Sequence, residues 1–331
     1  MDLSTRYLGM HLKNPLVPSA SPLSRSLDSA RRLEDAGAAA IIMYSLFAEA
    51  VDTESEAMER FLRSPYPPPR GTLSAEPQDF PGNLDRYLEQ ISSLKASLSI
   101  PVIASLNGVT LGGWVNHARE LQDAGADALE LNAYFIAANI EEPGSAVERR
   151  YLEILAELKK QLSIPINMKL SPMFSSIANM VKHIEDGGAD GVSLFNRFLQ
   201  PDIDITTLRL VPALHYSTPE DSLLPMHWIS ILFARTELSL GATGGVHGFE
   251  EAAKLLLAGA DVVHLCSSLL ENGPEHLGTV LADLEGWMEK QEFDDIDLVR
   301  GRMSELAVAD PAAFERAGYI NLLDKNSYPD R

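Results

Sequence analysis

A short motif built on glycine and alanine recurs four times in the chain, each time just before a run of apolar residues. Glycine just past an amphipathic helix adopts the left-handed conformation that ends a helix at little cost. Each following run is too short for a helix and suits a strand that is buried on both faces. The repeat therefore predicts helices that alternate with buried parallel strands. The four copies are Asp35-Ala36-Gly37-Ala38, Asp123-Ala124-Gly125-Ala126, Asp186-Gly187-Gly188-Ala189 and Leu257-Ala258-Gly259-Ala260.

Eight strands follow from this repeat and from two Ser-Ile-Pro segments, since proline is tolerated at the first residue of a strand. The strands are expected at residues 16–19, 39–43, 101–105, 128–132, 165–169, 191–195, 239–242 and 262–265. Helical spacing of apolar residues occurs at 31–36, 112–124, 147–162, 177–186, 226–236 and 249–258. Eight strand–helix units over about 250 residues favour an α/β fold of the TIM (β/α)8 barrel type. A doubly wound sheet with a second domain is the alternative.

The composition marks no break between domains, so a single domain over residues 1–331 is expected. Two connections, 47–83 and 197–225, are longer than a barrel requires, and both leave the C-terminal ends of strands. Long loops there are commonly lids or interface arms. An irregular acidic tail begins at about residue 292.

Charge and cysteine content exclude several classes of function. The chain has 331 residues, with 27 Lys and Arg against 47 Asp and Glu, a net charge of −20. Such an anionic chain disfavours binding to nucleic acid or to acidic lipid. Its one cysteine, Cys266, excludes an internal disulfide and an all-cysteine zinc or iron–sulfur site. No signal peptide and no apolar run of about 18 residues is evident, so a cytoplasmic protein is expected.

Polar groups follow the seventh and eighth strands, where barrel enzymes often bind phosphate. Gly244 and Gly245 let backbone amides approach an anion, and Ser267 and Ser268 add hydroxyl groups. Two ordinary tight turns are the alternative interpretation. The paired location favours a phosphate site.

Lys169 ends the fifth strand, where a lysine in an otherwise apolar strand must point at the barrel mouth. It suits a Schiff base, a phosphate ligand, or a charge beside an electron-rich ring. The structural alternative is a salt bridge to a carboxylate of a neighbouring strand such as Glu130.

Asparagines end or follow the third, fourth and sixth strands, at Asn107, Asn132 and Asn196. Because asparagine both donates and accepts hydrogen bonds, three around one mouth suit a planar heterocycle with amide-like edges. The mouth shows no His, Asp or Glu constellation for a metal. His247, His264 and Cys266 are interpreted as core or hydrogen-bonding residues rather than ligands or nucleophiles.

The order and positions of four motifs give a resemblance to the dihydroorotate dehydrogenase family of FMN-containing barrels, especially its soluble branch. The resemblance spans residues 14–270. Its motifs are Asn14-Pro15-Leu16-Val17, Glu130-Leu131-Asn132, Lys169-Leu170-Ser171-Pro172 and Thr243-Gly244-Gly245-Val246.

The resemblance implies an FMN site and a role in pyrimidine biosynthesis. Lys169 would lie near the N1–C2 side of the flavin, and the glycines and serines would hold the phosphate. The residues it assigns to FMN are Ala20, Ser21, Ser45, Asn107, Asn132, Lys169, Gly244, Gly245, Ser267 and Ser268. Those assigned to the substrate are Asn132, Asn196 and Arg197.

The chain departs from the family on the substrate side. Phe135 occupies the position of the Cys or Ser base, and phenylalanine cannot accept a proton. Tyr134 is a weak substitute because its ordinary pKa of about 10 makes it a poor base. Tyr44 stands where the family has a lysine, and Arg197 replaces a small hydroxyl residue. The catalytic residue is therefore left unassigned.

Three functional interpretations follow. The first is an FMN-dependent oxidoreductase that transfers hydride from a CH–CH substrate, such as a dihydropyrimidine or an altered compound, to flavin. The second is a flavin-binding electron-transfer or partner subunit without a substrate of its own. The third is a Schiff-base lyase or isomerase that uses Lys169. A homodimer is expected, and an electron-transfer protein is a candidate partner.

Overall fold

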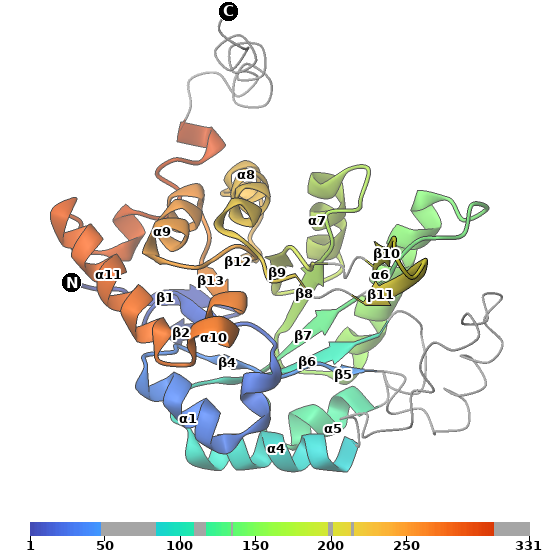
Figure 1. Ribbon diagram of the computed structural model, residues 1–331, viewed down its shortest axis with the longest axis horizontal. Coiled ribbons are helices and arrows are strands. Elements are labelled where there is room, and N and C mark those ends of the chain that lie inside the picture. Colours follow the sequence, from blue (N-terminus) through green and yellow to red (C-terminus); the bar gives the residue numbers. More distant parts are fainter. Residues whose placement is uncertain (48–83, 109–116, 134, 198–200, 213–214, 308–331) are drawn as a thin grey trace, which may run out of the picture.

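Eight parallel strands form a nearly closed barrel in the computed structural model, which describes residues 1–47, 84–108, 117–133, 135–197, 201–212 and 215–307 (Figure 1). Neighbouring strands follow the order β3-β13-β12-β9-β8-β7-β6-β4, and the short β5 (Leu46–Phe47) also pairs with β6. The Ala39 amide donates to the Leu16 carbonyl at 3.0 Å, which links the two ends of this order. The eight strands are β3 (Leu16–Pro18), β4 (Ile41–Ile42), β6 (Val102–Asn107), β7 (Ala128–Asn132), β8 (Ile166–Leu170), β9 (Gly191–Leu194), β12 (Ser239–Thr243) and β13 (Val262–Leu265).

The barrel prediction is confirmed, and each predicted strand lies where the sequence placed it. Glycine ends the helix before the strand at all four repeats, with φ of +103° at Gly37, +107° at Gly125, +84° at Gly188 and +124° at Gly259. An added Cβ on Gly259 would lie 2.4 Å from the Phe233 ring, so this position also lacks space for a side chain.

Helices surround the barrel (Figure 1). Their bounds are α1 (Leu27–Asp35), α4 (Leu84–Ser97), α5 (Ala118–Asp123), α6 (Gly144–Gln161), α7 (Ile177–Asp186), α8 (Leu223–Leu232), α9 (Phe249–Ala258), α10 (Ser267–Asn272) and α11 (His276–Lys290). The spacing of apolar residues did not predict α4, α10 or α11. Helix α8 is displaced from the predicted 226–236 because a 3-10 turn, η3 (Pro219–Ser222), leads into it. It ends early because Ala234 has a positive φ of 56°.

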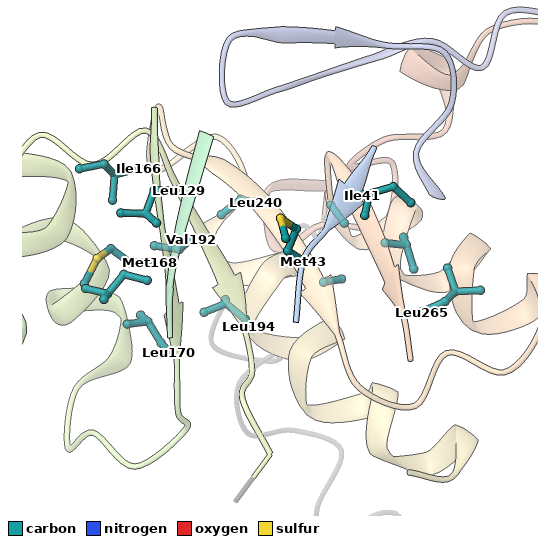
Figure 2. Close-up of a cluster of buried hydrophobic side chains, with 14 of the residues drawn as sticks. Ile41, Met43, Leu129, Ile166, Met168, Leu170, Val192, Leu194, Leu240 and Leu265 are labelled. Carbon is teal, nitrogen blue, oxygen red and sulfur yellow. The ribbon is translucent and has the colours of Figure 1, made fainter. Parts of the chain in front are cut away.

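Side chains alternate between two environments along each strand, as the pleat requires. On β8, Met168 and Leu170 belong to the apolar layer between the strands and the helices, whereas Asn167 and Lys169 are buried and polar. Figure 2 shows this apolar layer, to which Leu129, Val192 and Leu194 also contribute. The other face of these strands turns toward the barrel interior. That interior is polar near the C-terminal ends of the strands.

A hairpin that the sequence analysis did not predict covers the N-terminal end of the barrel. It consists of β1 (Thr5–Tyr7) and β2 (Met10–Leu12). Tyr7 and Leu8 form a separate apolar cluster with strand residues such as Val17 and Ile103. Because this end is filled, the barrel interior can open only toward the C-terminal ends of the strands.

The insertion at 197–225 contains an antiparallel hairpin of β10 (Pro201–Asp204) and β11 (Arg209–Pro212). The insertion at 47–83 lies outside the described residues from 48 onward. The tail includes the 3-10 turns η4 (Ile296–Leu298) and η5 (Glu305–Ala307), and its remainder from 308 is also outside. Of the described helices, none is both long and apolar enough to cross a membrane.

Candidate functional site

Two adjoining cavities lie where the barrel strands end. The larger has a volume of about 530 Å³ and the smaller about 350 Å³. Both are lined by Ala20, Ser45, Asn132, Asn196 and Arg197, so the two cavities adjoin and share these residues. Of the other predicted site residues, Lys169, Gly244, Gly245 and Ser267 line the larger cavity, and Ser21 and Asn107 line the smaller.

The Lys169 side chain extends from β8 and forms part of the wall of the larger cavity. Its side chain is 8% exposed, and Nζ donates a hydrogen bond to Ser19 Oγ at 3.2 Å. The same nitrogen lies 3.7 Å from Glu130 Oε1 of the neighbouring strand β7. The ion pair foreseen as the structural alternative is therefore present, yet the ammonium also faces the cavity.

The asparagines at the strand ends are brought together. The side-chain Nδ2 of Asn196 donates to Asn132 Oδ1 at 2.5 Å. The backbone N–H of Asn196 donates to the Leu170 carbonyl at 2.6 Å. Asn107 is the register partner of Asn132 on β6. Hydrogen-bonding groups of amide character thus line both cavities near their junction.

Another part of the lining of the larger cavity consists of glycine and hydroxyl groups, at Gly244, Gly245, Ser217 and Ser267. Gly244 has a φ of +106° and Gly245 one of +74°. The Ser217 amide donates to Ser267 Oγ at 3.1 Å, and the two hydroxyl groups lie 2.9 Å apart. Ser268 does not line the cavity: it is fully buried, and its hydroxyl donates to the Val246 carbonyl at 2.8 Å.

The segment from Ser217 to Ser222 was not assigned to the site from the sequence, although its Thr218-Pro219 start with Asp221 three residues on is a helix-capping signal. An added Cβ on Gly245 would lie 2.3 Å from the Ser222 nitrogen, so this segment packs directly on the glycine backbone. His247 Nε2 lies 2.6 Å from the Ser217 carbonyl oxygen and holds the segment from the other side. The prediction that His247 is a hydrogen-bonding residue is confirmed.

Arg197 lies at the junction of the cavities, half-exposed, with Nη1 3.7 Å from Asp221 Oδ2. The smaller cavity has a second arginine, Arg25, and the tyrosine Tyr44, neither of which the sequence analysis assigned to the site. Burial raises the pKa of Tyr44, although the nearby Arg25 and Arg86 act in the opposite direction. The Tyr44 hydroxyl is therefore protonated at neutral pH.

A buried polar network lies beneath the larger cavity. Asn167 Nδ2 donates to Glu130 Oε2 at 3.2 Å and to Ser193 Oγ at 2.8 Å. Ser193 Oγ lies 3.4 Å from His264 Nε2. Burial lowers the pKa of His264 to about 3, and the Lys169 charge acts in the same direction. His264 is a neutral, buried, hydrogen-bonding residue, as predicted.

Phe135, which the resemblance places at the position of the family's base, lines neither cavity. Its half-buried ring packs on the core, and the Arg150 guanidinium lies 3.9 Å from the ring centroid. Tyr134, the weak substitute, lies outside the described residues.

Cys266 lines the larger cavity with intermediate exposure, rather than being buried in the core. Burial raises the pKa of its thiol, while the Lys169 charge lowers it by a smaller amount. A protonated thiol is a weak nucleophile. Within the described part of the chain, no group of three His, Cys, Asp or Glu side chains is placed to hold a metal ion.

Comparison with known proteins agrees with this geometry. The family model described as dihydroorotate dehydrogenase matches residues 2–288. The catalytic subunit of dihydroorotate dehydrogenase B (NAD(+)) from Shouchella clausii is 26% identical over 307 residues, covering 90% of this chain and 97% of the relative. The subunit of the same name from Thermoplasma acidophilum is 27% identical, and the match covers 89% of this chain and 96% of the relative. A putative dihydroorotate dehydrogenase A (fumarate) from Aeropyrum pernix is 25% identical, covering 91% and 97%.

Proposed function

The chain belongs to the dihydroorotate dehydrogenase family, a family of oxidoreductases, and we propose that it binds FMN in the larger cavity and oxidises or reduces a small CH–CH substrate held in the smaller one. The observation that carries the proposal is the joining of the two cavities at the strand ends. Predicted flavin residues (Ala20, Ser45 and Asn132) and predicted substrate residues (Asn132, Asn196 and Arg197) line both cavities where they adjoin.

The residues of the larger cavity fit a flavin nucleotide. Its volume of about 530 Å³ is in the range of cofactor sites. An added Cβ on Gly244 would meet nothing nearer than 3.9 Å, so its bare backbone leaves room for an anion. His264 Nδ1 is buried without a hydrogen-bond partner among the described residues, and its side chain lines the same cavity. An orphaned polar atom in such a wall is consistent with a polar ligand.

The residues have distinct roles in this proposal. Gly244, Gly245 and Ser267 would hold the phosphate at one end. Lys169 would lie beside the ring system, where a positive charge stabilises negative charge that develops on a neighbouring group. Asn132, with Asn196 fixing its carboxamide, would orient the ring edge or the substrate. Bound FMN would supply a reversible acceptor for hydride.

Of the remaining predicted flavin residues, Ala20 and Ser45 line both cavities, and Ser21 and Asn107 line the smaller. They would therefore border the ring face next to the substrate. Ser268 would act indirectly, since its hydroxyl fixes the Val246 carbonyl.

The smaller cavity favours an anionic substrate with amide groups. Arg25 and Arg197 line it together with three asparagines; Asp221 lies 3.7 Å from Arg197, but no Asp or Glu is among the described lining residues of this cavity. In a chain of net charge −20, such a local excess of cations attracts anions. A carboxylate-bearing dihydropyrimidine has both the charge and the amide edges.

The proton-transfer group is the part of the family mechanism that this chain changes. Phe135 has no acidic proton and lies away from both cavities. Tyr44, which lines the smaller cavity, is protonated at neutral pH and suits the donation of a proton better than its removal. Tyr44 would therefore be the proton donor if the site reduces a double bond, and Tyr134 stays the weak candidate for a base in the oxidation.

Loss of the base also supports the second interpretation, a flavin-binding subunit that exchanges electrons with a partner protein. Two relatives are named as catalytic subunits. A protein partner, a homodimer and a cytoplasmic location stay predictions from the sequence. The Schiff-base interpretation gains no support from the family to which the chain belongs.

The test is the absorption spectrum of the purified protein, followed by mass spectrometry of any released cofactor. We expect flavin bands and the mass of FMN, and a colourless protein that does not bind added FMN would contradict the proposal. Anaerobic addition of dihydroorotate then separates the alternatives. Bleaching of the bound flavin supports the oxidoreductase, and bleaching only by a reduced electron-transfer protein supports the subunit.

A further inference from the structure

A buried ion pair lies beneath the larger cavity, and the proposed function assigns no role to its acidic member. The Glu130 side chain is 1% exposed, and Oε1 lies 3.7 Å from Lys169 Nζ. Oε2 accepts a hydrogen bond from Asn167 at 3.2 Å. Oε1 has no hydrogen-bond partner among the described residues. The Glu130 carboxylate therefore depends on the Lys169 ammonium to compensate its charge.

The dependence is mutual, because the other groups that lie next to Lys169, within the described part of the chain, carry no charge at neutral pH. Ser19 on β3 accepts the Lys169 hydrogen bond as a hydroxyl. His264 is neutral, with a pKa lowered to about 3, and burial raises the pKa of the Cys266 thiol above its ordinary value. Tyr7, below Ser193, has its pKa raised by burial and by the Glu130 charge. An ammonium that is 8% exposed would lose its compensating charge if Glu130 were neutral.

We infer that Glu130 is a positioning residue. It keeps the Lys169 side chain charged and holds it in the wall of the larger cavity. The carboxylate sits on β7 and the ammonium on β8, and register pairs Glu130 with Asn167 and Asn132 with Lys169. The two side chains are thus on the same face of adjacent strands, two residues apart in register. The meaning of this pair for catalysis rests on the proposed function, since a fixed positive charge is what the cavity would offer to a flavin ring.

The experiment measures the protonation of Lys169 directly, in protein to which no flavin has been added. Amines are acetylated briefly with acetic anhydride at a series of pH values on either side of the ordinary lysine pKa of about 10.4. The extent of reaction at Lys169 is read by peptide mass spectrometry. In the Glu130→Gln variant, an amide of nearly the same shape, we expect the midpoint of Lys169 acetylation to fall by about one pH unit or more. Lys254, exposed on α9, is the internal reference and should not change.

Two further variants separate charge from packing. Asn167→Ser removes the hydrogen bond to Glu130 without changing any charge, and its Lys169 midpoint should stay with that of the parent protein. Glu130→Asp keeps the charge on a shorter side chain and should lower the midpoint by a smaller amount. If Glu130→Gln does not fold, Glu130→Asp decides the question. If the Lys169 midpoint is unchanged in the Glu130 variant that folds, the inference is contradicted. It is also contradicted if the midpoint falls as far in Asn167→Ser as it does in that Glu130 variant.

This result is independent of the flavin proposal. A colourless protein with a lowered Lys169 midpoint in Glu130→Gln would contradict the proposed function alone. A yellow protein in which the midpoint is unchanged would contradict the role of Glu130 alone.

Discussion

The guanidinium of Arg25 lies 5.0 Å from the centre of the Tyr44 ring, and both side chains line the smaller cavity. Arg25 ends the 3-10 turn η1 (Pro22–Arg25), whereas Tyr44 lies two residues after the end of β4 (Ile41–Ile42). One positive charge of this cavity is therefore provided by a turn, and the other, Arg197, follows the end of β9. An arginine over an aromatic ring is held by about 0.5–1 kcal/mol at an exposed site, which fixes its direction without neutralising its charge.

We predict that Arg25→Gln weakens the binding of orotate much more than that of uracil, which is the same ring without the carboxylate. A charge-assisted hydrogen bond contributes about 1.5–3 kcal/mol, and the exposure of Arg25 reduces this, so a loss of about tenfold is expected for orotate. Isothermal titration of the FMN-loaded protein measures both ligands. The matched control is Arg31→Gln, since Arg31 is exposed on α1 and lines neither cavity. Equal weakening of both ligands would show that Arg25 does not recognise the carboxylate.

The two adjacent glycines at the phosphate end should respond differently to alanine. Both have positive φ, which costs a side chain roughly 1–3 kcal/mol. At Gly245 the added Cβ would also collide with the Ser222 and Thr218 backbone, at 2.3 and 2.8 Å, whereas at Gly244 its nearest neighbour would be the Asp221 carbonyl oxygen at 3.9 Å. Gly245→Ala should therefore lower the free energy of unfolding by more than about 2 kcal/mol and abolish FMN retention. Gly244→Ala should be milder.

Urea unfolding and the flavin content after gel filtration measure these effects. Gly286→Ala is the control, because Gly286 lies within α11 and an added Cβ there has no neighbour within 4 Å. It should stabilise the protein by up to about 1 kcal/mol. A Gly245→Ala protein as stable as Gly244→Ala would mean that the 218–222 segment does not pack on Gly245 as described.

The architecture could be predicted because it is encoded locally. Each glycine after a helix specifies a chain reversal within a few residues, and each buried strand is a continuous apolar run. The β1–β2 hairpin was missed because its strands have three residues each, too few for alternation to be visible. Helix α4 was missed because the proline- and charge-rich connection before it obscured where the helix begins.

The site could be predicted only where it is attached to strand ends. Lys169, Asn132 and Gly244 are fixed by the barrel itself, so their sequence positions imply a common location. Ser217 and Arg25 belong to irregular connections whose path depends on tertiary packing, and the sequence carries no local signal for which cavity they reach. Ser268 was assigned beside Ser267, but successive residues at the start of α10 face different directions, and its hydroxyl turns to Val246.

We predict that Phe135→Ala affects stability and not flavin binding. The ring packs on the core and lies 3.9 Å from the Arg150 guanidinium, and it lines neither cavity. Its loss should cost roughly 2 kcal/mol of stability, as expected for a half-buried aromatic that also holds a cation. The dissociation constant for FMN should stay within about twofold. Thermal unfolding and fluorescence titration with FMN measure the two quantities, and a large loss of FMN affinity would place Phe135 in the flavin site after all.

The buried His264 should make the protein sensitive to mild acid. Its pKa is lowered to about 3 in the folded protein, against about 6.5 for an ordinary histidine, because burial disfavours the charged ring. Above pH about 6.5 the ring is neutral in both states and contributes no pH dependence. Below that value the unfolded chain binds a proton that the folded protein does not, so stability falls as the pH falls, by up to about 1.4 kcal/mol per pH unit.

This dependence should be reduced in His264→Gln, which keeps a polar side chain beside Ser193 but cannot titrate. The comparison is best made between pH about 7 and pH about 5, where most carboxylates are still ionised in both states. Over that interval the parent protein should lose roughly 2 kcal/mol more stability than the variant, as measured by urea unfolding at each pH. Parallel losses in the two proteins would mean that the imidazole accepts a proton inside the folded barrel. In that case the polar interior beneath Lys169 would tolerate a second positive charge, and Glu130 could not be committed to Lys169 alone.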